Sequence, residues 1–341
     1  MIVPIILINF NNTPDTIECL QSILGSLNKN YIVTIVDNST DNGPVEELLK
    51  WLNNPYPVAS ISDFGDITFD EPIKTSFYAQ DELEKGEKLI KELVPGSIIV
   101  IKTTNKGFAH ANNIGMNLFL QNEKVDWIWL LNNDTVVPTE SIQKFYDCVS
   151  KLPENVGILS TALTSYFSPN NVQGYYGKYN TYTGVSKAIL ECPSDDIKIL
   201  DKYHTAMGAS QFVKRSFLKD VGLMSEEYFL YFEEIDWSVR AYKKNWKLAM
   251  TPLINIYHKE GSTIHGSADE KSLLGDLCDL VNRIKFTKKH LPALLPFIYG
   301  GLILSIANRI RRNQIKRAGL ILKYMLNPFK FNPLKYTRYK A

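Results

Sequence analysis

Short apolar runs alternate with stretches of helical periodicity through the first half of the chain. Runs rich in β-branched residues predict buried strands, at residues 3–9, 32–37, 98–102 and 127–131. Between the first two runs, apolar residues recur every three or four positions over residues 13–27, which predicts a helix that Thr13 or Asp15 could cap. Strands that alternate with helices indicate an α/β domain with a mostly parallel central sheet.

The pattern is interrupted at residues 53–96, where we expect an insertion on this scaffold. Its first part is rich in turn residues and in acidic side chains, namely Asp63, Asp66, Asp70 and Glu71, and residues 80–93 have helical periodicity. The α/β pattern then resumes and continues to the neighbourhood of residue 267. We therefore expect an α/β domain over residues 1–267 and a helical region over residues 268–341.

The composition is that of a folded protein. The 341 residues are 45% hydrophobic and 22% charged, which excludes a disordered tail, a collagen-like repeat and a disulfide-stabilised mini-protein. The cysteines lie far apart without a C-x-x-C pair, which argues against a zinc knuckle and fits a reducing compartment. Residues 1–8 lack a basic segment and a cleavage site, so they predict a strand rather than a secretory signal.

The small net charge of +2 conceals an asymmetry. Residues 280–341 contain 14 of the 38 Lys and Arg residues and no Asp or Glu, so all 36 acidic residues precede them. A basic tail could bind nucleic acid or an anionic membrane. Residues 291–307 carry no charge, and this apolar run favours the membrane over nucleic acid.

The apolar run is short for a transmembrane span and contains Pro292, Pro296 and a Gly-Gly pair, so we expect shallow or re-entrant insertion. In the segment that follows, one helical face would carry Arg309, Arg312, Lys316 and Lys323, and the opposite face Ile310, Ala318, Ile321, Leu322 and Met325. This pattern predicts an interfacial helix on an anionic membrane surface. A C-terminal helix packed on the body with a solvated basic face is the alternative.

Polar side chains follow three of the predicted strands: Asp37 and Asn38 the second, Asn105, Gly107 and Asn113 the third, and Asn132, Asn133 and Asp134 the fourth. Ligands of open α/β sheets bind at the carboxyl edge of the strands. Asp134 could hold a divalent cation on a diphosphate there, and His258, at the end of another apolar strand, could complete the metal shell. Turn formation explains each segment alone, but three occurrences on one sheet favour a binding site.

Carboxylates also follow an aromatic run at residues 228–232. Glu233, Glu234 and Asp236 lie at the start of a predicted helix, where the helix dipole stabilises acidic side chains. Packing against aromatic rings would desolvate a carboxylate and raise its pKa, which suits a proton acceptor. Asp236 and Arg240 are also correctly spaced for a salt bridge along the helix.

Taken in order, these segments resemble the inverting glycosyltransferases of family 2 with the GT-A fold, particularly the bacterial rhamnosyl- and galactofuranosyl-type branch. The resemblance extends over about residues 2–263. It rests on residues 8–11 (Ile-Asn-Phe-Asn), residues 36–43, the N-x-G-F-A-x-A-N-N-x-G stretch at 105–115, residues 130–135, residues 222–240, and His258 with Gly261 and Ser262. The resemblance implies a GT-A domain with a C-terminal helical extension.

The resemblance also implies roles for single residues. Asn9, Asp37 and Asn38 would contact the nucleotide base and ribose, and Asn105, Gly107 and Asn113 would line the nucleotide-sugar pocket. Asp134 matches the last residue of the family's D-x-D motif and would bind Mg²⁺ or Mn²⁺, with His258 as a second protein ligand. Asn132 replaces the first motif residue and would contact the ribose or metal-bound water, and Asn133 belongs to the same cofactor-binding set.

In the family's E-D-x-D signature the second residue is the catalytic base, and Glu234 occupies that position here. Because glutamate is longer than the usual aspartate, Glu233 or Asp236 could take the role instead. Ser225 replaces the aspartate of the family's G-x-F-D-E stretch, whereas Glu226 matches its glutamate. The implied reaction is a single in-line displacement, in which the carboxylate takes a proton from the acceptor hydroxyl and the anomeric configuration inverts.

The implied donor is a dTDP- or UDP-sugar carrying rhamnose, a hexose or galactofuranose. The implied acceptor is a saccharide or polyprenyl-linked saccharide in bacterial surface polysaccharide synthesis, at the cytoplasmic face of the cell membrane. A nicotinamide-dependent oxidoreductase would need G-x-G-x-x-G after the first strand, where residues 9–13 read Asn-Phe-Asn-Asn-Thr. A non-catalytic nucleotide-sugar or carbohydrate-binding protein on a degenerate form of the fold remains the alternative.

Overall fold

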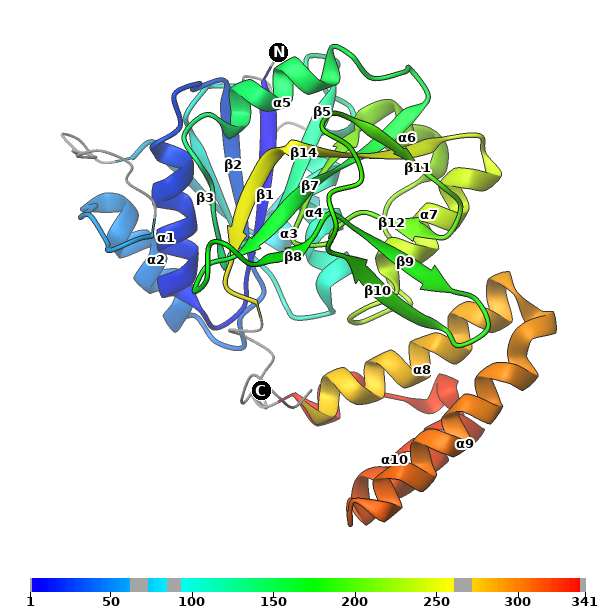
Figure 1. The fold of residues 1–341 in the computed structure, drawn as a ribbon. Helices are drawn as coiled ribbons and strands as arrows, with labels where there is room; N and C mark the ends of the chain where they lie inside the picture. Colours follow the sequence, from blue (N-terminus) through cyan, green and yellow to red (C-terminus); the bar gives the residue numbers. More distant parts are fainter. Residues whose placement is uncertain (1, 62–72, 85–92, 261–271, 338–341) are drawn as a thin grey trace.

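The computed structural model describes residues 2–61, 73–84, 93–260 and 272–337. Its largest element is a sheet with the strand order β11-β14-β7-β13-β5-β1-β2-β4-β3, in which β6 also pairs with β14 and β8 with β7 (Figure 1). The strands are β1 (Val3–Asn9), β2 (Tyr31–Asp37), β3 (Thr75–Ala79), β4 (Ile98–Lys102), β5 (Trp127–Asn132), β6 (Thr135–Val136), β7 (Val156–Ser165), β8 (Val172–Gly174), β11 (Lys198–Leu200), β13 (Ser210–Lys214) and β14 (Lys247–His258). On this path β13 and β11 run antiparallel to their neighbours, and every other pair is parallel.

A second, smaller sheet lies beside the large one. It contains β9 (Tyr176–Asn180), β10 (Val185–Ile189) and β12 (His204–Thr205). The helices of the α/β domain are α1 (Thr13–Leu24), α2 (Gly43–Asn53), α3 (Gln80–Glu84), α4 (Phe108–Leu120), α5 (Ser141–Val149), α6 (Arg215–Val221) and α7 (Glu233–Lys243).

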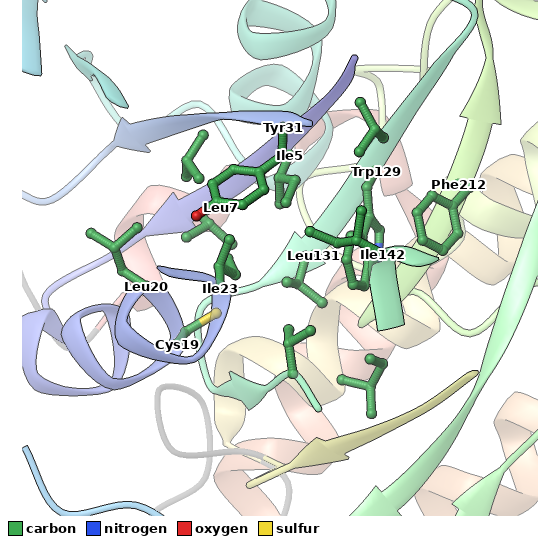
Figure 2. Packing of buried hydrophobic residues seen from close by; sticks show 14 of the residues in the cluster. Ile5, Leu7, Cys19, Leu20, Ile23, Tyr31, Trp129, Leu131, Ile142 and Phe212 are labelled. Carbon is green, nitrogen blue, oxygen red and sulfur yellow. The ribbon is translucent and has the colours of Figure 1, made fainter. Parts of the chain in front are cut away.

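Helices cover both faces of the large sheet. Successive side chains of a strand point to opposite faces, so strands made of apolar residues need cover on both. On β1, Ile5 and Leu7 pack with α1, α2 and α5, and Figure 2 shows them beside Leu20 of α1. Ile6 points the other way, into an apolar cluster to which α4, α6 and α7 contribute. The apolar runs of the sequence are thus strands buried on both sides.

The four strands predicted from the sequence are confirmed. The bounds of β1 and β4 are those expected, β2 begins at Tyr31, and β5 ends at Asn132. The first helix, α1, ends at Leu24 rather than at Leu27, because Ser26 and Leu27 belong to the turn that leads toward β2.

The expected insertion at residues 53–96 is not wholly outside the sheet. Its residues Thr75–Ala79 form β3, which extends the sheet by pairing in parallel with β4. The acidic residues Asp63, Asp66, Asp70 and Glu71 lie outside the described residues. Of the helix expected at 80–93, the described part contains α3, and residues 85–92 lie outside it.

The C-terminal region is helical, as predicted. It comprises α8 (Leu273–His290), α9 (Leu295–Arg311) and α10 (Ile315–Leu326), with short 3₁₀ turns at Pro292–Leu294, Pro328–Lys330 and Pro333–Tyr336. One face of α8 packs with α9 and α10 around Leu277, Val281 and Leu302. Its other face contacts the α/β domain through Phe286, which packs against Tyr179 and Phe232. The domain boundary expected near residue 267 lies outside the described residues.

The prediction that one continuous helix follows residue 307 is wrong, whereas its attachment to a membrane surface stays a prediction. The chain breaks at Asn313, which has a left-handed φ of 57°, between α9 and α10. Arg309 does not join an outer basic face, because its guanidinium turns inward to Asp276, with Nη2 at 2.5 Å from Oδ1. Ala318, Ile321 and Met325 are buried, whereas Leu322 and Ile310 are exposed. Ile321 and Met325 belong to the apolar cluster that includes α8.

The apolar run at 291–307 is also split between two environments. Ile298 and Leu302 are only 1% exposed inside the helical region, whereas Phe297 is 58% and Leu304 67% exposed. Within the described residues, Pro292–Arg311 is the one helical segment long and apolar enough to cross a membrane, with 20 residues and a mean hydropathy of 1.5. This property rests on length and composition alone. The extension therefore packs on the body and still presents an apolar outer surface.

Candidate active site

The parallel strands at the centre of the sheet bring polar residues to one edge. Register pairs Asn9 at the end of β1 with Asp37 at the end of β2, and Ile8 with Asn132 at the end of β5. Because carboxyl ends of parallel strands meet at the same edge, three of the predicted segments lie side by side. The structure confirms the prediction that polar residues at the ends of these strands lie at one edge of the sheet.

Asp37 is fully buried and held by several donors. Its carboxylate accepts hydrogen bonds from Asn9 Nδ2 at 2.6 Å, Lys102 Nζ at 2.7 Å and Ser39 Oγ at 2.9 Å. Asn9 is itself fixed by Thr16 Oγ1, 2.8 Å from its Oδ1. Asn9 therefore orients Asp37. Lys102 was missed in the sequence, where its only signal is its position at the end of a predicted strand.

Asn38 differs from its neighbours because it retains a free acceptor. The side chain is buried, and within the described part of the chain its Oδ1 has no hydrogen-bond partner. A buried unpaired carbonyl oxygen is costly unless a ligand or water donates to it. Of the residues expected at the nucleotide base and ribose, Asn38 is therefore the one whose polar group is available.

The loop before α4 needs glycine at position 107. Gly107 has a φ of 106°, and a Cβ there would lie 2.5 Å from the carbonyl oxygen of Phe229. Asn105 Oδ1 accepts from Gly107 N at 3.0 Å, and Phe108 N donates to Phe229 O at 3.0 Å. The loop is thereby joined to the segment that leads into α7.

Asn113 binds other parts of the protein, and its expected place at the nucleotide-sugar pocket stays a prediction. It is buried, and its amide donates to Met224 O at 3.0 Å and to Glu226 Oε1 at 2.8 Å while accepting from Met224 N. His110 Nδ1 lies 2.8 Å from the other oxygen of Glu226. Burial raises the pKa of Glu226, but the hydrogen bonds of Asn113 and His110 lower it overall. Asn113 thus positions Glu226 as an ionised carboxylate.

Asp134 and His258 come together as predicted. Strand β6 pairs with the end of β14, and this places His258 Nε2 3.3 Å from Asp134 Oδ1. His258 Nδ1 lies 2.9 Å from Gln173 Oε1, an acceptor that fixes the proton on Nδ1. Burial lowers the pKa of His258, but the charge and the hydrogen bond of Asp134, together with the charge of Glu260, raise it overall. Gln173 was missed because it lies on β8, a strand that the apolar pattern did not reveal.

This pair fits a divalent cation. It supplies a carboxylate and an imidazole whose Nε2 faces the carboxylate, and Gln173 orients the ring as outer hydrogen-bond partners of metal ligands do. Among the described residues, no three His, Cys, Asp or Glu side chains form a metal-binding group. An ion held here would therefore take its remaining ligands from a diphosphate and water.

Asn133 stabilises the turn that follows β5. It is buried, and its amide donates to Thr16 Oγ1 at 2.8 Å and to Asn12 O at 3.3 Å. The expected contact of Asn133 with a cofactor stays a prediction. Asn132 is half-buried at the end of β5, and its backbone N donates to Ala209 O at 2.9 Å. This bond brings the start of β13 to the same sheet edge.

Glu234 faces a cavity of about 310 Å³. The cavity lies between the small sheet, the loop before β13 and the start of α7, and its lining includes Lys187, Gly208, Tyr231 and Asp279. A Cβ at Gly208 would lie 2.2 Å from Glu234 Oε1, so glycine leaves the room that this carboxylate occupies. Burial raises the pKa of Glu234. Because Gly208 precedes Ala209, which bonds Asn132, the cavity adjoins the edge that carries Asp134.

The residues before α7 have an unusual backbone. Tyr231 and Phe232 have φ angles of 67° and 78°, both in the left-handed region. For residues other than glycine, this conformation costs about 1–2 kcal/mol each. The turn must therefore be stabilised by its surroundings, and it determines where Glu233 and Glu234 point.

Of the other two candidate bases, Glu233 faces the interior. It is buried and does not line the cavity, and within the described residues its Oε2 lacks a hydrogen-bond partner. Burial, followed by the charge of Glu234, raises the pKa of Glu233 well above its usual range. Its position favours Glu234 as the group that meets a substrate.

Asp236 is poorly suited to the role of the base. Its carboxylate is fully buried and contacts Arg240 Nε at 2.6 Å, His290 Nε2 at 2.7 Å and Lys289 Nζ at 3.0 Å. Burial alone would raise the pKa of Asp236, but the bonds to His290 and Arg240 hold it far below its usual range. A carboxylate that is permanently ionised and surrounded by cations is a poor proton acceptor.

No model of a known protein family matches the chain. A relative from Haloferax volcanii, the low-salt glycan biosynthesis hexosyltransferase Agl10, is 23% identical over 158 residues, which make up 46% of this chain and 50% of the relative. The chain thus matches about half the length of this curated relative.

The fold resembles that of many solved structures, and two of them illustrate the match. One is GalNAc-T7 with UDP, GalNAc and Mn²⁺, with a TM-score of 0.53 at 14% identity over 84% of this chain and 48% of that one. The other is S. aureus TarS 1–349, with a TM-score of 0.50 at 12% identity over 99% of this chain and 81% of that one. Both are GT-A glycosyltransferases, so the GT-A fold predicted for this chain is confirmed.

The ion pairs of Asp236 predict a pH-dependent stability. Replacing Asp236 with Asn removes the buried carboxylate that Arg240, Lys289 and His290 share, and we expect a loss of about 3–5 kcal/mol in the free energy of unfolding at pH 7. Because folding lowers the pKa of Asp236, its contribution is complete above the unfolded pKa of about 3.9 and is lost as the pH falls below it. Urea denaturation of both proteins between pH 7 and pH 3 should show the difference shrinking.

The matched control is Asp220→Asn. Asp220 also pairs with a lysine, Lys244, but half of its side chain is exposed, so we expect a much smaller loss. If Asp236→Asn were as stable as the control variant at pH 7, the cation cluster would not depend on this carboxylate.

Proposed function

We propose that this chain is an inverting glycosyltransferase that moves a sugar from a nucleoside-diphosphate sugar to a hydroxyl group of a saccharide or lipid-linked saccharide. The observation that carries this proposal is the placement of Glu234, with its raised pKa, in a cavity beside the sheet edge that holds Asp134 and His258. The hexosyltransferase relative and the GT-A fold support the same reaction class.

In this proposal each group has one task. Glu234 takes the proton of the acceptor hydroxyl as its oxygen attacks the anomeric carbon. Asp134 and His258 hold Mg²⁺ or Mn²⁺, which would neutralise charge on the diphosphate when bound. Asn38 contacts the nucleotide, and Asp37 and Asn9 support it. The single displacement inverts the configuration of the sugar.

The sugar and the nucleotide are finer parts of the proposal. A UDP-hexose is supported by the name of the hexosyltransferase relative and by the UDP in the GalNAc-T7 structure, and dTDP-rhamnose and UDP-galactofuranose are the other candidates. Donors that fit the site should raise the melting temperature of the protein, because ligand binding to the folded state stabilises it. A screen of activated sugars with Mn²⁺ therefore identifies the donor.

Replacing Glu234 with Gln should remove the group that accepts the proton and nearly preserve the shape of the side chain. We expect the rate of transfer to fall about 10²-fold or more, with donor affinity within a few-fold of the wild type. In the wild type, the rate should rise with pH through the raised pKa of Glu234, above the usual 4.3 or so for glutamate. Steady-state kinetics with the identified donor measure both effects.

Glu233→Gln is the comparison for this experiment. Near-normal turnover by Glu234→Gln, together with an inactive Glu233→Gln, would move the role of the base to Glu233. A wild-type protein that binds the sugar nucleotide but neither hydrolyses nor transfers it would favour a non-catalytic binding protein instead.

Asp134 and His258 should act through one metal ion. Replacing either with Ala should weaken nucleoside-diphosphate binding about tenfold or more in Mn²⁺, since each removes one ligand, and should matter little in EDTA. Isothermal titration calorimetry with UDP and with dTDP measures this. Asp201→Ala, a change at an exposed carboxylate, is the control. Equal losses with and without metal would show that the pair is structural.

We further propose that the protein is peripheral at the cytoplasmic face of the cell membrane, where a polyprenyl-linked acceptor would be found. The helix α9 exposes Phe297, Ile303 and Leu304, and the surrounding extension is strongly basic. Cations near an anionic surface contribute about 1 kcal/mol each, and inserted apolar side chains add the hydrophobic part of the binding. The packing of Ile298 and Leu302 inside the extension favours surface attachment over a span.

Flotation with anionic liposomes tests this attachment. Replacing both Ile303 and Leu304 with Asp should weaken liposome association about 10²-fold, because each lost apolar contact is worth roughly 1.5 kcal/mol or more. Leu27→Asp is the control, since Leu27 is 76% exposed on the α/β domain. If the wild type fails to float at low salt, the membrane proposal is wrong and the exposed face has another partner.

A further inference from the structure

The turn that presents Glu234 is held from outside the α/β domain. Tyr231 and Phe232 are left-handed, and the side chain of Phe232, the N-cap residue of α7, cannot make a capping hydrogen bond. The nearest restraint comes from α8, where Asn282 is buried and its Nδ2 donates to Leu230 O at 2.9 Å and to Tyr231 O at 3.0 Å. These two bonds fix the carbonyls at the start of the strained turn.

Two further residues on the same face of α8 contact the start of α7. Asn282, Phe286 and His290 are four residues apart, so they lie on one side of the helix. The ring of Phe286 packs against Phe232, with centroids 5.7 Å apart, and His290 Nε2 contacts Asp236 Oδ1 at 2.7 Å. The three side chains thus hold the turn before Glu234, the residue that caps α7, and the first turn of the helix.

We propose that Asn282 is a positioning residue for the carboxylate of Glu234, and that α8 is a structural part of the active site rather than only an attachment helix. This inference rests on the proposed function. Asn282 does not line the cavity and acts through the backbone of residues 230–232. By keeping that backbone left-handed, it keeps Glu234 in the space that Gly208 leaves open.

The chemistry of position 282 supports this role over simple packing. An apolar side chain would fill the same buried space but could not donate the two hydrogen bonds that Asn282 gives to the carbonyls of Leu230 and Tyr231. The loss of these two bonds would remove a restraint on the left-handed turn, which could then relax. A relaxed turn would move Glu234 and expose it to water, which would bring its pKa toward the usual value for glutamate.

The test is Asn282→Asp, which keeps the shape but sets a carboxylate against two carbonyl oxygens. We expect kcat to fall about tenfold to a hundredfold, since small misplacements of a reacting group have effects of this size, with donor KM within about threefold of the wild type. The acidic limb of the pH-rate profile should shift to lower pH. Hydrogen exchange of the amides of residues 230–236 should become faster.

Asn308→Asp is the matched control, because it makes the same chemical change on the exposed side of α9. It should leave kcat, the pH profile and hydrogen exchange unchanged. If Asn282→Asp does not fold, Asn282→Ser replaces it, since serine is smaller and retains one donor. Wild-type kcat, pH profile and exchange rates in the folded variant would overturn the proposal.

Hydrogen exchange separates this inference from the proposed function. If the wild type transfers no sugar from any donor, the proposed function fails, and the exchange of residues 230–236 still shows whether Asn282 holds the turn. Faster exchange in that case would leave Asn282 as a restraint on backbone structure only, and the positioning role would be rejected. Loss of kcat with unchanged exchange would equally reject the mechanism through the turn.

Discussion

The parallel pairing of β1 with β2 and β5 is the constraint on which the rest of the site depends. This register aligns Asn9 with Asp37 and brings Asn132 beside them. Once the strand ends coincide, Asp134 follows Asn132 by two positions, and the backbone bond from Asn132 to Ala209 fixes the approach of β13. A shift of one residue in this pairing would move the side chains of the shifted strand to the opposite face of the sheet and separate Asn9 from Asp37.

Two acidic residues, Asp134 at this edge and Glu234 in the adjoining cavity, have surroundings that act differently on their carboxylates. Asp134 lies against the imidazole of His258, whose pKa is raised. Glu234 lies in a partly desolvated cavity, where burial raises its pKa. Such a separation suits one carboxylate for binding a cation and the other for accepting a proton. Asp236 shows the third outcome, since surrounding cations keep its carboxylate permanently ionised.

The sequence predicted what depends on local patterns and missed what depends on distant partners. Apolar runs predicted the bounds of the strands. The positions of Asp37, Asp134 and His258 at or just after the ends of apolar strands identified them as candidate site residues. The partners Lys102 and Gln173 contact these residues across 65 and 85 positions, and no local pattern contains such pairings. For the same reason Asn113 and Asn133 were assigned to ligands, although their amides bind the protein.

The C-terminal extension was the least predictable part, because its charge pattern suggested a separate membrane element. Its helix α8 has two apolar faces, one against α9 and α10 and the other against Tyr179 and Phe232 of the body. A helix buried on both sides cannot move without exposing apolar surface, which makes movement unfavourable. The outer helices and the turn before Glu234 are therefore mechanically connected through α8. A membrane that orients α9 would also set the orientation of the cavity relative to its surface.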